Sequence, residues 1–194
     1  SLAVKLNGKD SFSLIDFFNG QRDLKDKVIR VLHNLSFIED PSRAFRAVRF
    51  EQRFQFAISS QTLAFMKSAI KKKMIDELSG HRLLNELILI LKERKPLHCI
   101  RRMKELELLQ FIHPRLLQTP AEFNILERIR DFLAGSKIVP LDKPPEVWFL
   151  YFLGMFYALD GPAREEAIKR VQLPARMRER LMRDIEGCKN ALQV

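Results

Sequence analysis

Prolines divide most of the chain into stretches with helical periodicity. Five of them suit the first turn of a helix, where proline loses no backbone hydrogen bond: Pro41, Pro96, Pro120, Pro162 and Pro174. The sequence after Phe37 predicts eight helices, at 41–54, 60–70, 80–94, 96–109, 120–134, 144–158, 162–171 and 174–191. The clearest break between them is the loop at 134–146. We therefore predict a mainly α, multi-helical fold.

Only the segment before Phe37 favours strands. "SFSLIDFF" (11–18) alternates weakly between apolar and polar residues and ends at Asn19-Gly20, a dipeptide typical of turns. "KVIRVLHNL" (27–35) is rich in β-branched residues. A two-stranded ribbon is marginally stable alone and normally belongs to a larger sheet. We therefore expect these strands to be a short piece of a larger β domain.

Composition excludes several classes of protein. Hydrophobic residues make up 46% of the chain and charged residues 30%, as in ordinary globular proteins. No apolar run approaches the ~20 residues that span a bilayer, so no membrane partner is expected. Cys99 and Cys188 are too few and too far apart for a disulfide framework or a zinc site. A reducing cytoplasm fits this cysteine content, and the oligomeric state stays open.

The net charge is the strongest compositional signal. The chain has 34 Lys and Arg residues against 24 Asp and Glu residues, which gives a formal charge of +10. Such an excess favours a polyanionic partner, and nucleic acid is the first candidate. A basic but merely solvated surface is the alternative.

The stretch "EDPSRAFR" (39–46) combines ordinary helix capping with one unusual residue. Asp40 is a good N-cap and Pro41 a good first helical residue. Arg43 occupies the third helical position, where a capping box would carry Glu or Gln and where the helix dipole disfavours a cation. We expect Arg43 to pair with the Asp40 carboxylate one turn back, which would fix the two side chains side by side.

Such a pair has the hydrogen-bonding pattern of a base-recognition element. Cytosine and adenine each present an amino donor beside a ring-nitrogen acceptor, whereas guanine and uracil present an acceptor beside an N–H donor. An aspartate next to an arginine could accept from the amino group and donate to the ring nitrogen of C or A only. A purely structural capping role is the competing interpretation.

The run "LIDFFNGQRDLKDKVIRVLHNLSFIEDPSRAFRAVRF" (14–50) resembles the class II tRNA nucleotidyltransferase and poly(A) polymerase family. In that family a D-x-x-G-G-x-x-D-L motif is followed by E-D-x-x-R-x-x-R, and "SGHRLLNEL" (79–87) resembles its S-x-E-R-x-x-x-E-L motif. The resemblance is strong over about residues 11–95. Asn19 stands where the first glycine is usual, and His81 stands where Glu is usual.

The resemblance implies roles for particular residues. A flexible motif that couples head and neck domains is matched by Asp16, Gly20 and Asp23. The nucleotide-binding template is matched by Glu39, Asp40, Arg43 and the second arginine, Arg46. The motif that supports the neck helix is matched by Arg82 and Glu86.

The resemblance also implies a domain order and an activity. Residues 1–36 would be the C-terminal remnant of a nucleotidyltransferase head, 37–95 a helical neck that selects the nucleotide and binds RNA, and 96–194 a helical body. The implied reaction is template-independent transfer of AMP, or also of CMP, from ATP or CTP to an RNA 3′ end. The tRNA 3′ end is the expected partner. CCA addition, A addition and polyadenylation are all compatible with these motifs.

In the family, Mg²⁺ is held by a D-x-D motif in a preceding head domain. This chain contains no D-x-D, so we expect it to begin just after the catalytic half, to hold no metal and to be inactive alone. A non-catalytic helical module that binds RNA or protein is the alternative from another class.

Further basic residues are candidates for RNA contact. They lie on three predicted helices: Arg49 and Arg53, then Lys71, Lys72 and Lys73, and finally Arg176 and Arg180. Arg49, like Arg46, could instead hold the neck helix in register. The lysine run could be a solvated helix end, and the last helix an ordinary surface helix.

Overall fold

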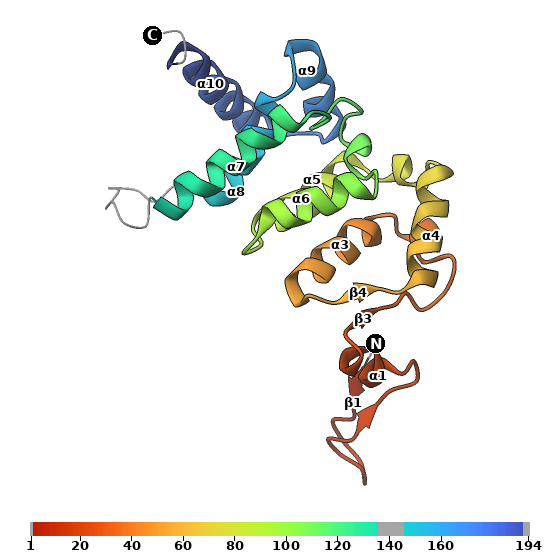
Figure 1. Cartoon of the computed structure of the whole chain (residues 1–194). Helices are drawn as coiled ribbons and strands as arrows, with labels where there is room; N and C mark the ends of the chain where they lie inside the picture. The colour runs from red at the N-terminus through yellow and green to blue at the C-terminus, as the bar shows by residue number, and fades with distance from the viewer. Residues whose placement is uncertain (1, 136–145, 192–194) are drawn as a thin grey trace.

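The computed structural model describes residues 2–135 and 146–191, and within them the fold is mainly α, as predicted. The α-helices are α1 (Gly20–Lys25), α2 (Ser36–Glu39), α3 (Ser42–Phe54), α4 (Ser60–Lys71), α5 (Gly80–Leu91), α6 (Pro96–Glu105), α7 (Pro120–Gly135), α8 (Val147–Tyr157), α9 (Gly161–Arg170) and α10 (Ala175–Ala191). Two 3₁₀ turns, η1 (Met74–Glu77) and η2 (Leu109–Phe111), complete the helical part. The elements follow one another along an extended body, with the N-terminal segment at one end and α9 and α10 at the other (Figure 1).

The eight predicted helices are present, but two end earlier than expected. The predicted helix 80–94 ends at Leu91, and the predicted helix 96–109 ends at Glu105. After α6, Glu107 adopts a left-handed conformation with φ 59°, and the Leu108 N–H donates back to the Met103 carbonyl. This Schellman arrangement stops the helix without a glycine, which is why the sequence did not predict it. The first two residues of the predicted helix 144–158 lie outside the described residues.

The strand predictions need correction. Strands β2 (Leu14–Ile15) and β3 (Val28–Ile29) are two residues each, much shorter than 11–18 and 27–35. They do not pair with each other: β2 pairs antiparallel with β1 (Ala3–Val4). The partner of β3 is β4 (Ala57–Ile58), in a parallel pair, so the region after Phe37 is not entirely helical.

Asn19-Gly20 was predicted to be a turn, and it is the start of a helix. Asn19 has φ 57° and ψ 34°, and α1 begins at Gly20 directly after it. Asn tolerates this left-handed conformation better than most residues, which explains how it can replace the usual glycine. The short helix α1 then leads to β3.

One hydrophobic cluster extends from Phe37 to Ile185 and joins the predicted neck and body. Helix α3 packs against α5 and α6, α5 packs against α8, and α7 packs against α8. On α3 the buried residues recur at helical spacing and include Phe45 and Val48, so the opposite face carries Arg43 and Arg46. The boundary at 95/96 stays a prediction, because the core is continuous across it. No helix in the described part of the chain has both the length and the apolarity needed to cross a membrane.

Candidate nucleotide-selecting site

Asp40 lies at the corner between α2 and α3. Its backbone is extended, with φ −141° and ψ 90°, so it interrupts the helical path before Pro41 turns the chain into α3. Its Oδ1 accepts hydrogen bonds from the Ser42 N–H at 3.1 Å and from the Ser42 hydroxyl at 2.6 Å. Helix α3 begins at Ser42 with Pro41 at the N-cap position, one residue later than predicted, yet the Asp40 carboxylate accepts from the first N–H of the helix and is thereby fixed at the helix start.

Arg82 reaches the same carboxylate from α5. Its Nη2 donates to Asp40 Oδ1 at 2.7 Å and lies 3.4 Å from Ser42 Oγ. Burial alone raises the pKa of Asp40, but the Ser42 hydroxyl and the Arg82 charge outweigh burial and hold that pKa below its ordinary value. Asp40 is therefore an anionic acceptor at neutral pH.

The expected close pairing of Asp40 with Arg43 is only loosely made. Arg43 Nε is 4.0 Å from Asp40 Oδ2, which is too far for a hydrogen bond. The Arg43 guanidinium instead donates from Nη1 to the Ser36 carbonyl at 3.1 Å and lies 3.7 Å from Glu39 Oε2. Arg43 is therefore stabilised in the first turn of α3 by the first and last residues of the preceding α2, Ser36 and Glu39.

Arg43 and Asp40 still present a donor and an acceptor to one side of the corner. The Arg43 side chain is 40% exposed, so N–H groups not used by Ser36 remain available. Glu39 Oε2 lies 3.7 Å from Arg43 Nη1 and 3.3 Å from His33 Nε2, and the Glu39 side chain is 52% exposed. Glu39 therefore helps to position Arg43, and its own contact with a nucleotide stays a prediction.

Arg49 is not on the surface. Its side chain is 10% exposed and lies between Glu86 of α5 and Glu93, at 3.9 and 3.7 Å. Burial raises the pKa of Glu86 above its ordinary value, although Arg49 lowers it. Of the two roles considered for Arg49, holding α3 in register is the one that its burial supports, and RNA contact is not.

Arg53 is ion-paired within the protein, whereas Arg46 is not. Arg53 makes a two-pronged ion pair with Glu93, with Nη2–Oε1 at 2.6 Å and Nε–Oε2 at 3.0 Å. Arg46 is exposed and has no ion-pair or hydrogen-bond partner among residues 2–135 and 146–191. Arg46 therefore remains free to meet a phosphate near Arg43, one turn away on the same helix.

The predicted coupling motif forms a small capped corner. The Asp16 carboxylate accepts from the Gly20 N–H at 2.7 Å and from the Gln21 N–H at 2.9 Å, and these backbone donors keep the pKa of Asp16 low. Asp23 pairs with Arg30 Nε at 3.1 Å, which ties α1 to the residue after β3. These contacts brace the segment from Asp16 to Arg30, and its role in coupling two domains stays a prediction.

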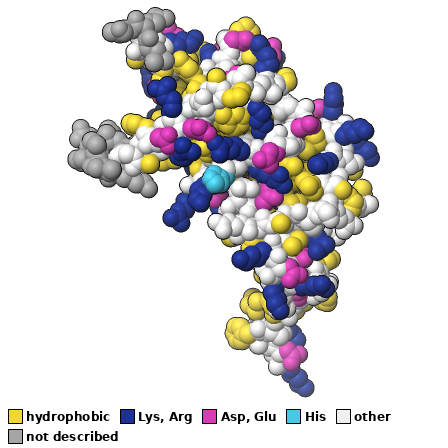
Figure 2. Space-filling model, viewed as in Figure 1, with side chains coloured by type: hydrophobic (Ala, Val, Ile, Leu, Met, Phe, Trp, Pro, Cys, Tyr) yellow, Lys and Arg dark blue, Asp and Glu magenta, His cyan; other side chains and the backbone are white. Residues whose placement is uncertain are grey.

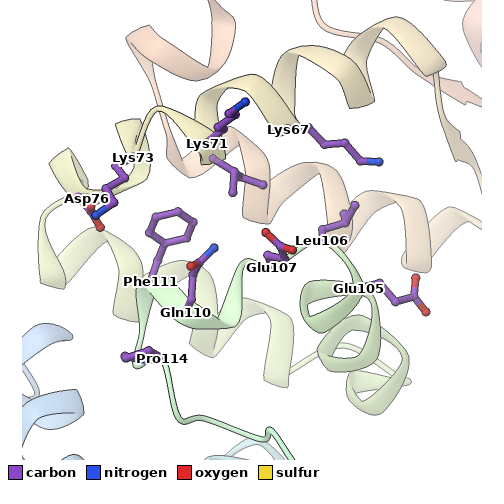
Figure 3. A pocket seen from close by; sticks show the side chains of 11 residues that line it. Lys67, Lys71, Lys73, Asp76, Glu105, Leu106, Glu107, Gln110, Phe111 and Pro114 are labelled. Atoms are coloured by element: carbon purple, nitrogen blue, oxygen red, sulfur yellow. The ribbon is translucent and has the colours of Figure 1, made fainter.

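The lysine run borders a cavity of about 640 Å³ between α4 and the end of α6 (Figure 3). Lys71 and Lys73 line it together with Lys67, whereas Lys72 is exposed beside it. The cavity also contains carboxylates, Asp76, Glu105 and Glu107, so its charge is mixed. Figure 3 shows the ring of Phe111 projecting between the two walls.

On α10 the arginines are mostly engaged within the protein. Arg180 donates to Glu146 at 2.7 Å and its guanidinium lies 3.8 Å from the Phe149 ring centroid. Arg178 donates to Glu165 at 2.8 Å. Arg176 is exposed and unpaired within the described chain. Lys and Arg side chains are nevertheless spread over the visible face, among hydrophobic and acidic ones (Figure 2).

Three contacts of this site were not predicted from the sequence. They are the hydrogen bonds from Ser42 to Asp40, from Arg43 to the Ser36 carbonyl, and from Arg82 to Asp40. A serine two residues after an aspartate is a recognisable turn signal. Nothing local indicates the other two. Across residues 2–135 and 146–191, no group of three or more His, Cys, Asp or Glu side chains could hold a metal ion.

Comparison with known proteins places this geometry in context. The family model described as "Probable RNA and SrmB-binding site of polymerase A" matches residues 55–118. The A-adding tRNA nucleotidyltransferase of Geobacter sulfurreducens is 44% identical over 182 residues, which cover 94% of this chain and 21% of that protein. The chain thus spans about a fifth of the length of this curated relative.

Two solved structures have the same fold. A CCA-adding enzyme in complex with ATP has a TM-score of 0.83 and 35% identity, over 98% of this chain and 45% of that one. A tRNA nucleotidyltransferase complexed with a primer tRNA and an incoming ATP analogue has a TM-score of 0.81 and 32% identity, over 93% of this chain and 53% of that one. With its ordered motifs, its helical fold and these relatives, the chain belongs to the class II tRNA nucleotidyltransferase and poly(A) polymerase family.

Proposed function

We propose that this chain is the nucleotide-selecting and RNA-binding part of an enzyme that adds AMP to tRNA 3′ ends without a template. The enzyme could also transfer CMP as a second nucleotide. The observation that carries it is the corner at α2 and α3, where an ionised Asp40 and a partly exposed Arg43 lie together. The 44% identity to an A-adding tRNA nucleotidyltransferase supports A addition in particular.

Base selection follows from the two side chains. The free Oδ2 of Asp40 would accept from the amino group of adenine or cytosine, and an Arg43 N–H would donate to the neighbouring ring nitrogen. Guanine and uracil would place an acceptor against the carboxylate and a donor against the guanidinium. Both mismatches leave polar groups unsatisfied, which costs about 1–3 kcal/mol for each buried group.

The chemistry would be attack of the RNA 3′ hydroxyl on the nucleotide α-phosphate, with pyrophosphate as the leaving group. Mg²⁺ would stabilise the developing charge. No group of three or more His, Cys, Asp or Glu side chains among the described residues could hold it, and we assign the metal to the D-x-D motif of a head domain outside them. What this chain would contribute is the orientation of the base, and Arg46 would meet a phosphate nearby.

The proposed domain order is the one expected from the family, with head residues 1–36, neck 37–95 and body 96–194. Its support is the apolar surface of the N-terminal lobe, where Phe12 is 79% and Phe17 is 86% exposed. A head domain packed on this lobe would remove those rings from water. We place the enzyme in the cytoplasm, where two unpaired cysteines are ordinary.

RNA binding by the neck and body rests on charge. The net charge is +10, and several cations have no partner among the described residues, including Arg46, Lys72 and Arg176. Cations that no carboxylate neutralises are available to bind the phosphate groups of RNA. Lys71 and Lys73, at the rim of the cavity beside α4, are further candidates.

The test is an incorporation assay with the complete protein, Mg²⁺ and each labelled nucleotide in turn. With tRNA ending in CC we expect transfer of AMP and little transfer of GMP or UMP. A tRNA that lacks CC, tested with CTP, distinguishes CCA addition from A addition, and an oligo(A) primer tests for polyadenylation. Binding of tRNA without transfer of any nucleotide would instead support a non-catalytic RNA-binding module.

A further inference from the structure

Ser42 is almost completely buried beside the carboxylate that the proposed function uses. The residue is 3% exposed, and its Oγ lies 2.6 Å from Asp40 Oδ1 and 3.4 Å from Arg82 Nη2. A guanidinium N–H can only donate, so Oγ accepts from Arg82 and its own proton points to Asp40. The direction of both hydrogen bonds is thereby fixed.

The two oxygens of Asp40 are consequently in different situations. Oδ1 receives three donors, the Ser42 N–H at 3.1 Å, the Ser42 hydroxyl and the Arg82 Nη2 at 2.7 Å. Arg43 Nε lies 4.0 Å from Oδ2, beyond hydrogen-bond reach, and no hydrogen bond to Oδ2 is found among residues 2–135 and 146–191. A carboxylate oxygen has two lone pairs, so Oδ1 is saturated while Oδ2 stays open.

This asymmetry bears directly on which bases fit. A free carboxylate offers two parallel acceptors, which match two adjacent donors in a bidentate pair. Guanine presents such a pair, because its ring N–H stands beside its exocyclic amino group. With Oδ1 saturated, Asp40 offers one acceptor only, which suits the single amino group of adenine or cytosine and denies guanine its second hydrogen bond.

We infer that Ser42 is a positioning residue that determines specificity: with Arg82 it saturates Oδ1 of Asp40 and so excludes guanine nucleotides. This inference rests on the proposed function. The two side-chain donors come from different helices, Arg82 from α5 and Ser42 from α3. The Ser42 backbone N–H stays in every variant, so either side-chain donor alone still fills the second lone pair of Oδ1, and both must be removed to open it.

The experiment measures kcat and KM for ATP and GTP with the complete protein and tRNA ending in CC. Arg82→Met alone leaves the Ser42 N–H and hydroxyl on Oδ1 and should keep the wild-type ratio of kcat/KM for GTP to that for ATP. Ser42→Ala combined with Arg82→Met opens one lone pair, and the ratio should rise about tenfold, the size of one hydrogen bond to a charged group. KM for ATP should rise while kcat changes little. Ser42→Thr in the Arg82→Met background keeps the hydroxyl and should restore selectivity.

Two further variants separate positioning from folding. Ser59→Ala removes a matched helix cap, the bond from the Thr62 N–H to Ser59 Oγ at 3.2 Å on α4, and should leave the GTP-to-ATP ratio unchanged. Ser42→Cys in the Arg82→Met background replaces the hydroxyl with a thiol that donates only weakly, and should raise the ratio even if the variant with Ser42→Ala folds poorly. The Arg82 side chain is 52% exposed, so its replacement is not a core substitution.

These experiments distinguish a failure of the role inferred for Ser42 from a failure of the proposed function. Nucleotide transfer that keeps wild-type selectivity when Ser42→Ala or Ser42→Cys is combined with Arg82→Met would overturn the role of Ser42 and leave the proposed function standing. Failure of the wild-type protein to transfer any nucleotide would overturn the proposed function, and the inference with it.

Discussion

Arg82 Nη2 lies 2.7 Å from Asp40 Oδ1, although the two residues are 42 positions apart in the chain. One turn further along α5, Glu86 faces Arg49 of α3 at 3.9 Å. Helices α3 and α5 are therefore joined by two charge contacts, one at the exposed corner and one in the interior. The exposed contact holds the candidate site, and the interior contact holds the helices.

Arg43→Ala in the complete protein should relax base selection rather than abolish transfer. The variant loses a charged hydrogen bond to the ring nitrogen of A or C, about 1.5–3 kcal/mol, and it also removes the group that opposes guanine and uracil. Measuring kcat/KM for all four nucleotides tests this. Arg94→Ala, at an exposed position without a partner in the described chain, is the control. An unchanged preference for A and C would exclude Arg43 from the template.

Arg49→Ala should destabilise the chain by about 3 kcal/mol, because it leaves Glu86 as a buried carboxylate without its ion-pair partner, whereas Glu93 keeps its pair with Arg53. Arg46→Ala, three residues earlier on the exposed face, should change the free energy of unfolding by about 0.5 kcal/mol or less. Urea unfolding of the three proteins gives both values. Equal losses in the two variants would mean that Arg49 has no special structural role.

Glu86→Gln should improve stability at pH 7 relative to wild type more than it does at pH 4. Burial raises the pKa of Glu86 in the folded state, so the folded protein holds this proton more tightly than the unfolded chain. Stability from this group is therefore present below the unfolded pKa and lost as the pH rises through the folded pKa. Glutamine does not ionise, so Glu86→Gln does not lose this stability as the pH rises. Thermal unfolding of both proteins at both pH values measures the stability gained by the variant, which should be the same at pH 4 and pH 7 if the pKa of Glu86 is not perturbed.

Binding of tRNA should weaken with salt and should depend on unpaired cations. Replacing Lys71, Lys72 and Lys73 with Ala should lower affinity and reduce the slope of log K against log salt by roughly 0.7 for each phosphate that these lysines no longer neutralise. Arg180→Ala should change neither, because Glu146 and the Phe149 ring already occupy its guanidinium. A flat salt response in the wild-type chain would mean that the net charge only solvates the surface.

The chain alone should not transfer nucleotides. The reason is the absence of D-x-D from the sequence, together with the lack of any metal-binding carboxylate group among the described residues. Incubation of the purified chain with labelled ATP, Mg²⁺ and tRNA, beside a reaction without protein, measures this. Incorporation above that background would show that catalytic groups lie within these 194 residues.

The helices and the capped corner at Asp40 were determined by the sequence itself, because each depends on neighbours within a few residues. Helical periodicity, proline in the first turn and an aspartate before it are local properties, and α3, α4, α6, α7 and α10 begin within two residues of their predicted starts. Even the replacement of glycine by Asn19 is a local matter, since asparagine itself tolerates the left-handed conformation.

Only the tertiary structure decided which groups those local elements meet. The pairing of β3 with β4 joins Val28 to Ala57, and two-residue strands have too little pattern to predict a partner. The four arginines of α3 share a similar helical spacing, yet Arg49 is buried and Arg46 is exposed, because α5 packs against one edge of that face. The contact between Arg82 and Asp40 likewise depends on how α3 and α5 cross, and a crossing is a property of packed surfaces rather than of either helix alone.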